Sequence, residues 1–145
     1  MITFETSIEI RRPVEAVFTF VSDFRNIPQW QKAMKEAHVT PDGLPAVGTK
    51  GRQVGSFLGV KLEGTSEITA LEPNHSFSFK ASSGPASMEA TWRFEAAGEG
   101  TRLSTTYQVE PGGLFKVAGP LFASQFKKQQ EADWQRLKEL LEVQG

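Results

Sequence analysis

The chain has 145 residues, of which 39% are hydrophobic and 23% charged, and its formal net charge is -1. That length fits one domain, 1–145, and the balanced charge provides no overall field that would attract nucleic acid or anionic lipid. The absence of cysteine excludes disulfides, thiolate nucleophiles and Cys-based zinc sites.

The first predicted element is a half-buried strand over residues 2–10, where apolar residues alternate with polar ones. Pro13 suits the first position of a helix, and apolar residues at helical spacing continue until that helix ends near Asp23. Residues 27–30 form a turn that is expected to start a second small helix reaching Met34.

Short β segments separated by turn residues follow the two small helices. Glycine, proline and asparagine recur between apolar runs, as in Glu72-Pro73-Asn74. The predicted strands span residues 36–40, 49–56, 60–71, 75–82, 86–96 and 101–110. Because tight links join successive strands, they predict an antiparallel meander, and with the first strand the sheet has about seven strands.

A long C-terminal helix is predicted over residues 114–142. Its first half is apolar, and the face that includes Leu121 and Phe126 is expected to belong to the core. An interior proline loses a backbone hydrogen bond, so Gly119-Pro120 predicts a kink. One long helix that closes a set of strands indicates an α+β fold, in which a curved antiparallel sheet wraps around the helix and leaves space between them.

No segment of the sequence indicates export or membrane insertion. The opening residues alternate instead of forming the basic start and apolar run of a signal peptide, and no stretch of about 18 apolar residues occurs. We therefore expect a cytoplasmic protein without stable membrane insertion. The sequence leaves the oligomeric state open.

Five short segments are informative about the family when they are taken together and in this order: the opening strand into residues 12–18, then 23–30, 47–49, 68–73 and 100–103. In this order they resemble the START-like SRPBCC superfamily, and within it the polyketide cyclase/dehydrase family. The resemblance covers essentially the whole chain. It implies a helix-grip fold, in which the curved sheet grips the C-terminal helix over a hydrophobic cavity.

Strand parity predicts which side chains face the helix, because alternate residues of a strand point to the same side. Ala70 and Ala90 are among the inward positions, whereas the charged strand residues point outward. The predicted ligand-binding lining combines aromatic, thioether and hydroxyl side chains: Trp30, Met34, Phe79, Met88, Trp92, Thr105, Tyr107, Phe122 and Phe126. Such a lining suits a flat or lipidic ligand, although simple core packing explains the same residues. The family pattern puts Trp30 at the cavity mouth.

Tyr107 is the best polar candidate for orienting a ligand, since its phenol can bond a carbonyl or hydroxyl group. A core tyrosine bonded to backbone or water produces the same pattern. With the charged strand residues outside, the interior is expected to have almost no titratable groups, which disfavours acid–base catalysis. His38 and His75 lack companions at metal-ligand spacing, so neither a metal site nor a cofactor is expected.

Three classes of function are compatible with this sequence. The leading hypothesis is binding or transport of a small hydrophobic molecule, such as a lipid, polyketide or isoprenoid, between the sheet and the C-terminal helix. The second is an enzyme of the polyketide aromatase/cyclase type. The third is a cochaperone-like protein-interaction module, which would show an exposed apolar patch and a filled interior.

Overall fold

The computed structural model describes residues 2–41, 43–57, 59–84, 86–110 and 120–144, without the side chains of Phe57, Val60, Phe122 and Gln144. Within these ranges the strands are β1 (Ile2–Ile10), β2 (Met34–Thr40), β3 (Lys50–Phe57), β4 (Val60–Glu72), β5 (Ser76–Ser83), β6 (Ala86–Ala97) and β7 (Gly100–Glu110). They form one antiparallel sheet in the order β1-β7-β6-β5-β4-β3-β2. The predicted meander is confirmed, and β1 extends it beside β7.

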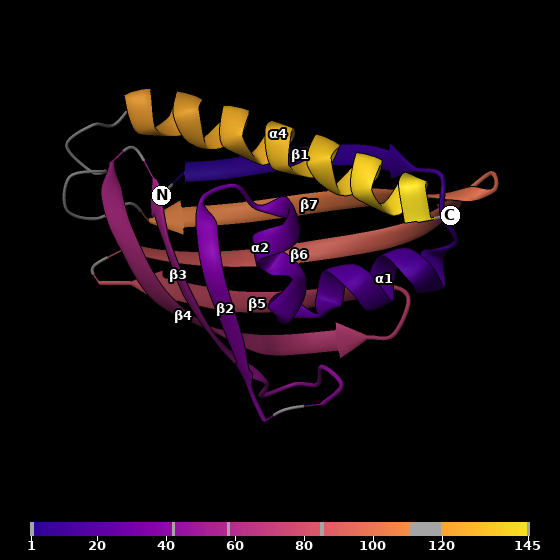
Figure 1. The fold of residues 1–145 in the computed structure, drawn as a ribbon, viewed down its shortest axis with the longest axis horizontal. Coiled ribbons are helices and arrows are strands. Elements are labelled where there is room, and N and C mark those ends of the chain that lie inside the picture. The colour runs from indigo at the N-terminus through magenta and orange to yellow at the C-terminus, as the bar shows by residue number, and fades with distance from the viewer. Residues whose placement is uncertain (1, 42, 58, 85, 111–119, 145) are drawn as a thin grey trace.

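The helices all lie on the concave face of this curved sheet (Figure 1). They are α1 (Val14–Ser22), the short 3-10 helix η1 (Phe24–Asn26), α2 (Ile27–Trp30) and the long helix α4 (Pro120–Gln144). In Figure 1, α4 runs along β1, while α1 and α2 cover the middle strands. The predicted α+β class, with a long C-terminal helix over a curved sheet, is therefore confirmed.

The prediction that the second small helix reaches Met34 is wrong, because α2 ends at Trp30. The next residues form a turn in which the Met34 N–H donates to the carbonyl of Gln31 at 3.1 Å. The Ser56 N–H donates to the Ala33 carbonyl at 2.9 Å, so the turn is held on β3 and Met34 begins β2.

Gly55 explains why the turn can approach β3 so closely. A Cβ atom built on Gly55 would lie 2.0 Å from the carbonyl oxygen of Ala33, which no side chain can tolerate. Glycine thus permits contact between two backbones. This contact places the first residue of β2, Met34, opposite Gly55.

The core of the molecule is a dense group of aromatic rings between α1, η1 and the middle strands. Phe77 is fully buried and lies with its ring centroid 4.9 Å from that of Trp92. Phe18 of α1 meets Phe94 at 5.1 Å and Phe24 meets Phe79 at 5.3 Å, both edge to face. Edge-to-face pairs of this kind add to the stabilisation from burial.

Strand parity predicts the inward residues correctly except in β4. The register between β4 and β5 shifts between Ile68 and Ala70, as a β-bulge requires. Ile68 is buried, but Ala70 is exposed and Leu71 packs against the core instead. The prediction that Ala70 faces inward is therefore wrong, because the extra residue of the bulge reverses the alternation.

The buried face of α4 differs from the predicted one at its beginning. Trp134, Leu137 and Leu141 are buried, whereas Leu121 is 57% exposed, so its assignment to the core is wrong. At 3.6 residues per turn, Leu121 lies about 160° around the helix axis from Leu137. Phe126 lies about 20° from Leu137 and packs partly buried against the core. The predicted kink at Gly119-Pro120 falls mostly outside the described residues.

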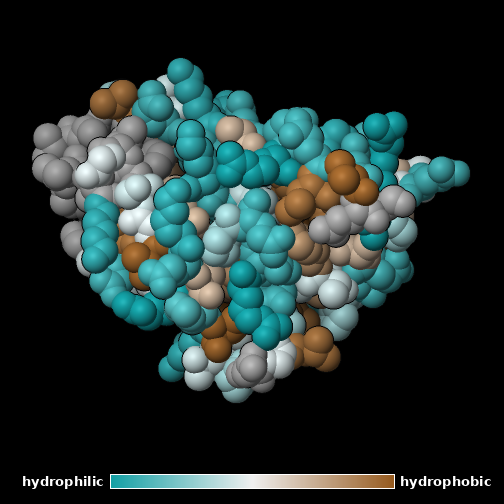
Figure 2. Space-filling view, viewed as in Figure 1, coloured by the Kyte–Doolittle hydropathy of each residue, from teal (hydrophilic) through white to brown (hydrophobic). Residues whose placement is uncertain are grey.

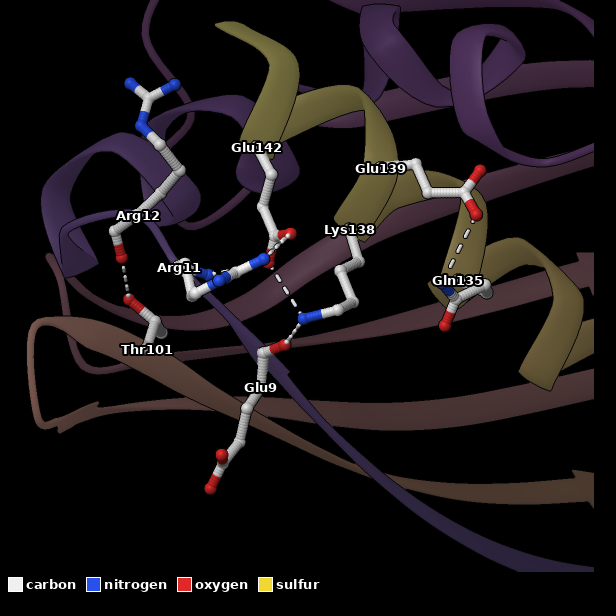
Figure 3. A network of polar contacts seen from close by, with 8 residues as sticks. All are labelled: Glu9, Arg11, Arg12, Thr101, Gln135, Lys138, Glu139 and Glu142. Atoms are coloured by element: carbon white, nitrogen blue, oxygen red, sulfur yellow. Dashed lines mark hydrogen bonds and ion pairs between the residues drawn. The ribbon is translucent and has the colours of Figure 1, made fainter. Parts of the chain in front are cut away.

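Polar contacts fasten the C-terminal end of α4 to the end of β1 (Figure 3). The Lys138 ammonium donates to the Glu9 carbonyl at 2.7 Å and to the Glu142 carboxylate at 2.8 Å. The Arg11 N–H donates to the same carboxylate at 2.9 Å, and the Arg12 guanidinium donates to the Leu141 carbonyl at 3.0 Å. Polar side-chain contacts and packing against the core therefore both hold this end of α4 in place.

Candidate ligand-binding cavity

A cavity of about 210 Å³ lies between the sheet and the helices, open to solvent on one side. Its described lining comes from η1, α2 and the turn after it, from β2 to β7, and from α4. The apolar members are Phe24, Ile27, Ala33, Met34, Leu62, Phe79, Ala81, Ala86, Met88, Trp92, Val109 and Phe126. Because cores pack at the density of organic crystals, a volume of this size is an unfilled site and not ordinary packing.

Six of the nine predicted ligand-binding residues line this cavity: Met34, Phe79, Met88, Trp92, Tyr107 and Phe126. Trp30 and Thr105 are buried but are not among the described lining residues. The Thr105 hydroxyl is instead hydrogen-bonded to the Thr6 hydroxyl of β1. The Phe122 side chain lies outside the described residues. Contact of these residues with a ligand stays a prediction.

Three tryptophans form one cluster next to the cavity. Trp30 stacks on Trp134 with ring centroids 4.7 Å apart, and Trp92 lies edge-on to Trp134 at 5.2 Å. Each side chain is at most 3% exposed, and none of the three indole N–H groups has an acceptor among the described residues. Trp30 and Trp134 thus pack behind the wall, and Trp92 forms part of it.

Asp133 is the only charged residue among the described residues that line the cavity. It lies on α4 and is 4% exposed. Its Oδ1 atom accepts hydrogen bonds from the Lys32 backbone N–H at 3.1 Å and from the Gln129 amide at 2.7 Å. Burial raises the pKa of Asp133 above its ordinary value of 3.8, and these hydrogen bonds oppose the rise.

Asp133 contradicts the prediction that the interior has almost no titratable groups. That prediction considered the strands and overlooked the helix, although the helical spacing contains the signal. Asp133 follows Phe126 by seven residues and precedes Leu137 by four, so it lies on their face of α4. A carboxylate inside an apolar helical stripe is the pattern that identifies it.

Tyr107 provides the second polar group of the cavity wall. Its side chain is 1% exposed, and its ring lies 6.2 Å from that of Phe126. Burial raises the pKa of the Tyr107 phenol, and the nearby charge of Asp133 acts in the same direction. The phenol therefore stays protonated at neutral pH and is able to donate a hydrogen bond.

The rest of the described lining is neutral. It consists of Gln31, Gln53, Gly64, Thr65, Ser66, Ser82, Ser83, Ser87, Gln129 and Gln130. The Gln53 amide donates to the Ser66 hydroxyl at 3.0 Å, and Gln129 is bonded to Asp133. The predicted lining does not contain these residues, because polar residues of strands, loops and helices have no distinct sequence signal for lining a cavity.

The described residues contain no group of three or more metal-ligating side chains that could hold an ion. His38 and His75 are both exposed. Within the described part of the chain, no helix has the length and apolar character needed to span a bilayer.

A curved antiparallel sheet that encloses a C-terminal helix over an apolar cavity defines a START-like, helix-grip protein. The chain belongs to the family described as polyketide cyclase/dehydrase and lipid transport, whose model matches residues 1–142. The resemblance stated from the sequence is thus confirmed. The family includes proteins that bind hydrophobic ligands and proteins that cyclise polyketides. No curated protein matches this chain.

Solved structures of low sequence identity share the fold. A protein from Thermus thermophilus is 19% identical and superposes with a TM-score of 0.84, with 99% of each chain covered. A START superfamily protein from Mycobacterium smegmatis is 18% identical, with a TM-score of 0.80 and 99% of each chain covered. The Zhui aromatase/cyclase from Streptomyces sp. R1128 is 13% identical, with a TM-score of 0.76 over 97% of this chain and 93% of that one.

Proposed function

We propose that this protein binds or carries a small hydrophobic molecule in the cavity between the sheet and α4. The observation that carries the proposal is the mostly apolar volume of about 210 Å³ beside a tightly packed aromatic core. Apolar surface buried on binding supplies roughly 25 cal/mol per Å² before the costs of association. The lining therefore favours a ligand that is largely hydrocarbon.

The size of the cavity restricts the ligand. A cavity of about 150 Å³ lined by Leu, Ile and Phe accommodates benzene. The present volume of about 210 Å³ suits a body closer to naphthalene in size. A long acyl chain would have to extend through the open side. The edge-on rings of Phe79 and Trp92, 5.2 Å apart, offer aromatic faces and edges to a flat ligand.

The protein-interaction module is less well supported. Figure 2 shows a mostly hydrophilic face over α4, α1 and α2, with one group of hydrophobic atoms between α4 and α1 and smaller groups elsewhere. The large hydrophobic residues known to be exposed, Leu44, Val47, Leu121 and Val143, are spread along the chain. Isolated exposed apolar residues are normal on a protein surface and need no partner.

Calorimetric titration with 1-naphthylmethanol tests the proposal. We expect a dissociation constant on the order of micromolar and a raised melting temperature, since a ligand that binds only the folded state stabilises it. Ala81→Leu extends a side chain into the cavity and is expected to weaken binding about tenfold or more. Ala70→Leu adds the same atoms on the exposed side of β4 and serves as the matched control.

Two outcomes would contradict the proposal. Equal weakening by Ala70→Leu and Ala81→Leu would place the binding site elsewhere. No binding of 1-naphthylmethanol, together with an unchanged melting temperature, would mean that the cavity does not take this class of ligand.

An aromatase/cyclase activity is the second candidate, favoured by one observation. Asp133 and Tyr107 lie close enough inside an apolar cavity for the charge of one to shift the pKa of the other. A carboxyl with a raised pKa beside a neutral phenol is suited to moving a proton between ligand atoms. Mass spectrometry of a reactive poly-β-ketone incubated with the protein would show loss of one water. Asp133→Asn should slow that loss, and no turnover by the wild type would exclude the activity for that compound.

A further inference from the structure

Oδ2 of Asp133 is an acceptor without a hydrogen-bond donor among the described residues, and the other described lining residues of the cavity are uncharged. The described residues donate two hydrogen bonds to this carboxylate, and Oδ1 accepts both of them. Since Oδ2 is not sealed from solvent, a water molecule or a ligand donor in the cavity can complete its hydrogen bonding.

Among the described residues, no side chain supplies a counter-ion at this carboxylate. Lys32 and Arg136 are the nearest cations that influence it, yet both side chains are exposed and neither forms an ion pair with it among the described residues. Lys32 contacts Asp133 through its backbone N–H alone. No lysine or arginine occurs among the described lining residues of the cavity.

The charge balance discriminates between ligand head groups. An ammonium placed at Oδ2 would form a charge-assisted hydrogen bond in a partly enclosed, mostly apolar cavity, where such bonds are stronger than in bulk water. A ligand carboxylate would bring a second negative charge next to Asp133 and would meet no cation among the described lining residues. Like charges at this distance oppose each other, so one of the two groups would have to take up a proton.

We propose that the cavity selects hydrophobic amines, with the ligand ammonium donating to Oδ2 of Asp133, and discriminates against hydrophobic carboxylates. This selectivity rests on the proposed binding function and specifies the chemical class of its ligand. Tyr107 is the neutral polar residue next to this site, and its phenol, which also interacts with the Trp92 and Thr105 side chains, can donate to a further polar atom of the ligand. The aromatic wall holds the hydrocarbon body.

Three probes with the same naphthyl body test the selectivity on the wild-type protein. They are 1-naphthylmethylamine, which is protonated at neutral pH, the neutral 1-naphthylmethanol, and the anionic 1-naphthoate. Calorimetry should show the amine binding roughly 10- to 100-fold more tightly than the carboxylate, as expected for one charge-assisted hydrogen bond. The alcohol should fall between them.

Asp133→Asn separates the charge from the shape of the site. The asparagine oxygen still accepts from Lys32 and Gln129, so the variant is expected to fold, and a thermal melt checks this. Its affinity for 1-naphthylmethylamine should fall roughly 10- to 100-fold, while 1-naphthylmethanol changes little. Glu131→Gln removes an exposed carboxylate two residues away on the same helix and should change none of the three affinities.

The results separate this inference from the proposed function. If all three probes bind the wild type equally well, the cavity binds hydrophobic molecules but Asp133 does not select among them. An unchanged amine affinity in Asp133→Asn leads to the same conclusion. If no probe binds, the proposed function fails as well. Should Asp133→Asn not fold, the preference of the wild type for the amine over the carboxylate still decides the question.

Discussion

Asp133 and Glu142 lie on the same helix, about two and a half turns apart, and their environments are opposite. Glu142 accepts hydrogen bonds from Lys138 and from the Arg11 N–H, and these lower its pKa to about 2. Asp133 is buried against the cavity, and its pKa is raised. The Glu142 carboxylate connects the helix to β1, whereas the Asp133 carboxylate lines the cavity, where burial disfavours its charge.

This difference divides α4 into two functional parts. The C-terminal part, with Leu137 and Leu141 in the core and Lys138 on β1, holds the helix in place. The earlier part, with Phe126 and Asp133, borders the cavity, and under our proposal it determines what the cavity binds. The following changes test this division, beginning with the largest expected effect.

Leu137→Ala is expected to destabilise the protein most. Its side chain is fully buried, and removing a buried leucine costs roughly 2–5 kcal/mol through lost burial and the void that remains. Leu121→Ala makes the same change at an exposed position and should stay within about 0.5 kcal/mol of the wild type. Urea denaturation measures both. Similar midpoints for the two variants would show that the buried face of α4 has been misassigned.

Phe126→Ala should have a smaller effect on stability than Leu137→Ala. Phe126 is only partly buried and borders the cavity, so the cost should lie below the roughly 3–5 kcal/mol of a fully buried phenylalanine. The same change widens the cavity, and binding of 1-naphthylmethanol should weaken as a ring contact is lost. A loss of stability with unchanged affinity for 1-naphthylmethanol would show that Phe126 does not contact the ligand.

Asp133→Asn is expected to stabilise the protein at neutral pH. The folded-state pKa of Asp133 lies above its ordinary value of 3.8, so the folded protein binds more protons than the unfolded chain between these two pKa values. The contribution of Asp133 to the free energy of unfolding therefore falls as the pH rises through that window. The advantage of the variant, measured by urea midpoints from neutral pH downward, should shrink on acidification. An advantage independent of pH would contradict this assignment.

Glu142→Gln should show the opposite sign and the smallest effect. The folded-state pKa of about 2 lies below the ordinary 4.5, so the contribution of Glu142 is present above 4.5 and is lost as the pH falls toward 2. The variant should be slightly less stable at neutral pH and should approach the wild type as the pH falls through about 2. Added salt should reduce the difference, because the group is partly exposed.

Much of this architecture can be predicted from the sequence, because turn residues and alternation define the strands and their antiparallel order. The errors arise where local pattern and tertiary contact disagree. The bulge after Ile68 reverses the alternation at Ala70, and the close backbone approach at Gly55 converts the predicted helical residue Met34 into the start of a strand. Neither event has a signal of its own in the local sequence.

The candidate site was less accessible to prediction than the sheet. Large apolar residues such as Phe79 and Trp92 have the same pattern whether they line a cavity or fill a core, so only the structure reveals the unfilled volume. The position of Asp133 within the apolar stripe of the helix could have identified it from the sequence. Its contact with the turn at Lys32 could not have been predicted, because Lys32 is far away in the sequence.

The tryptophan cluster gives the molecule an intrinsic optical reporter. Trp30, Trp92 and Trp134 are all the tryptophans of the chain, and they are buried within a few ångströms of one another. Their emission should be shifted to the blue, because no solvent relaxes the excited indoles, and excitation energy should pass readily among the three rings. Trp92 also borders the cavity. A quencher bound there would therefore lower the fluorescence of all three tryptophans together, and ligand binding could be followed without an added label.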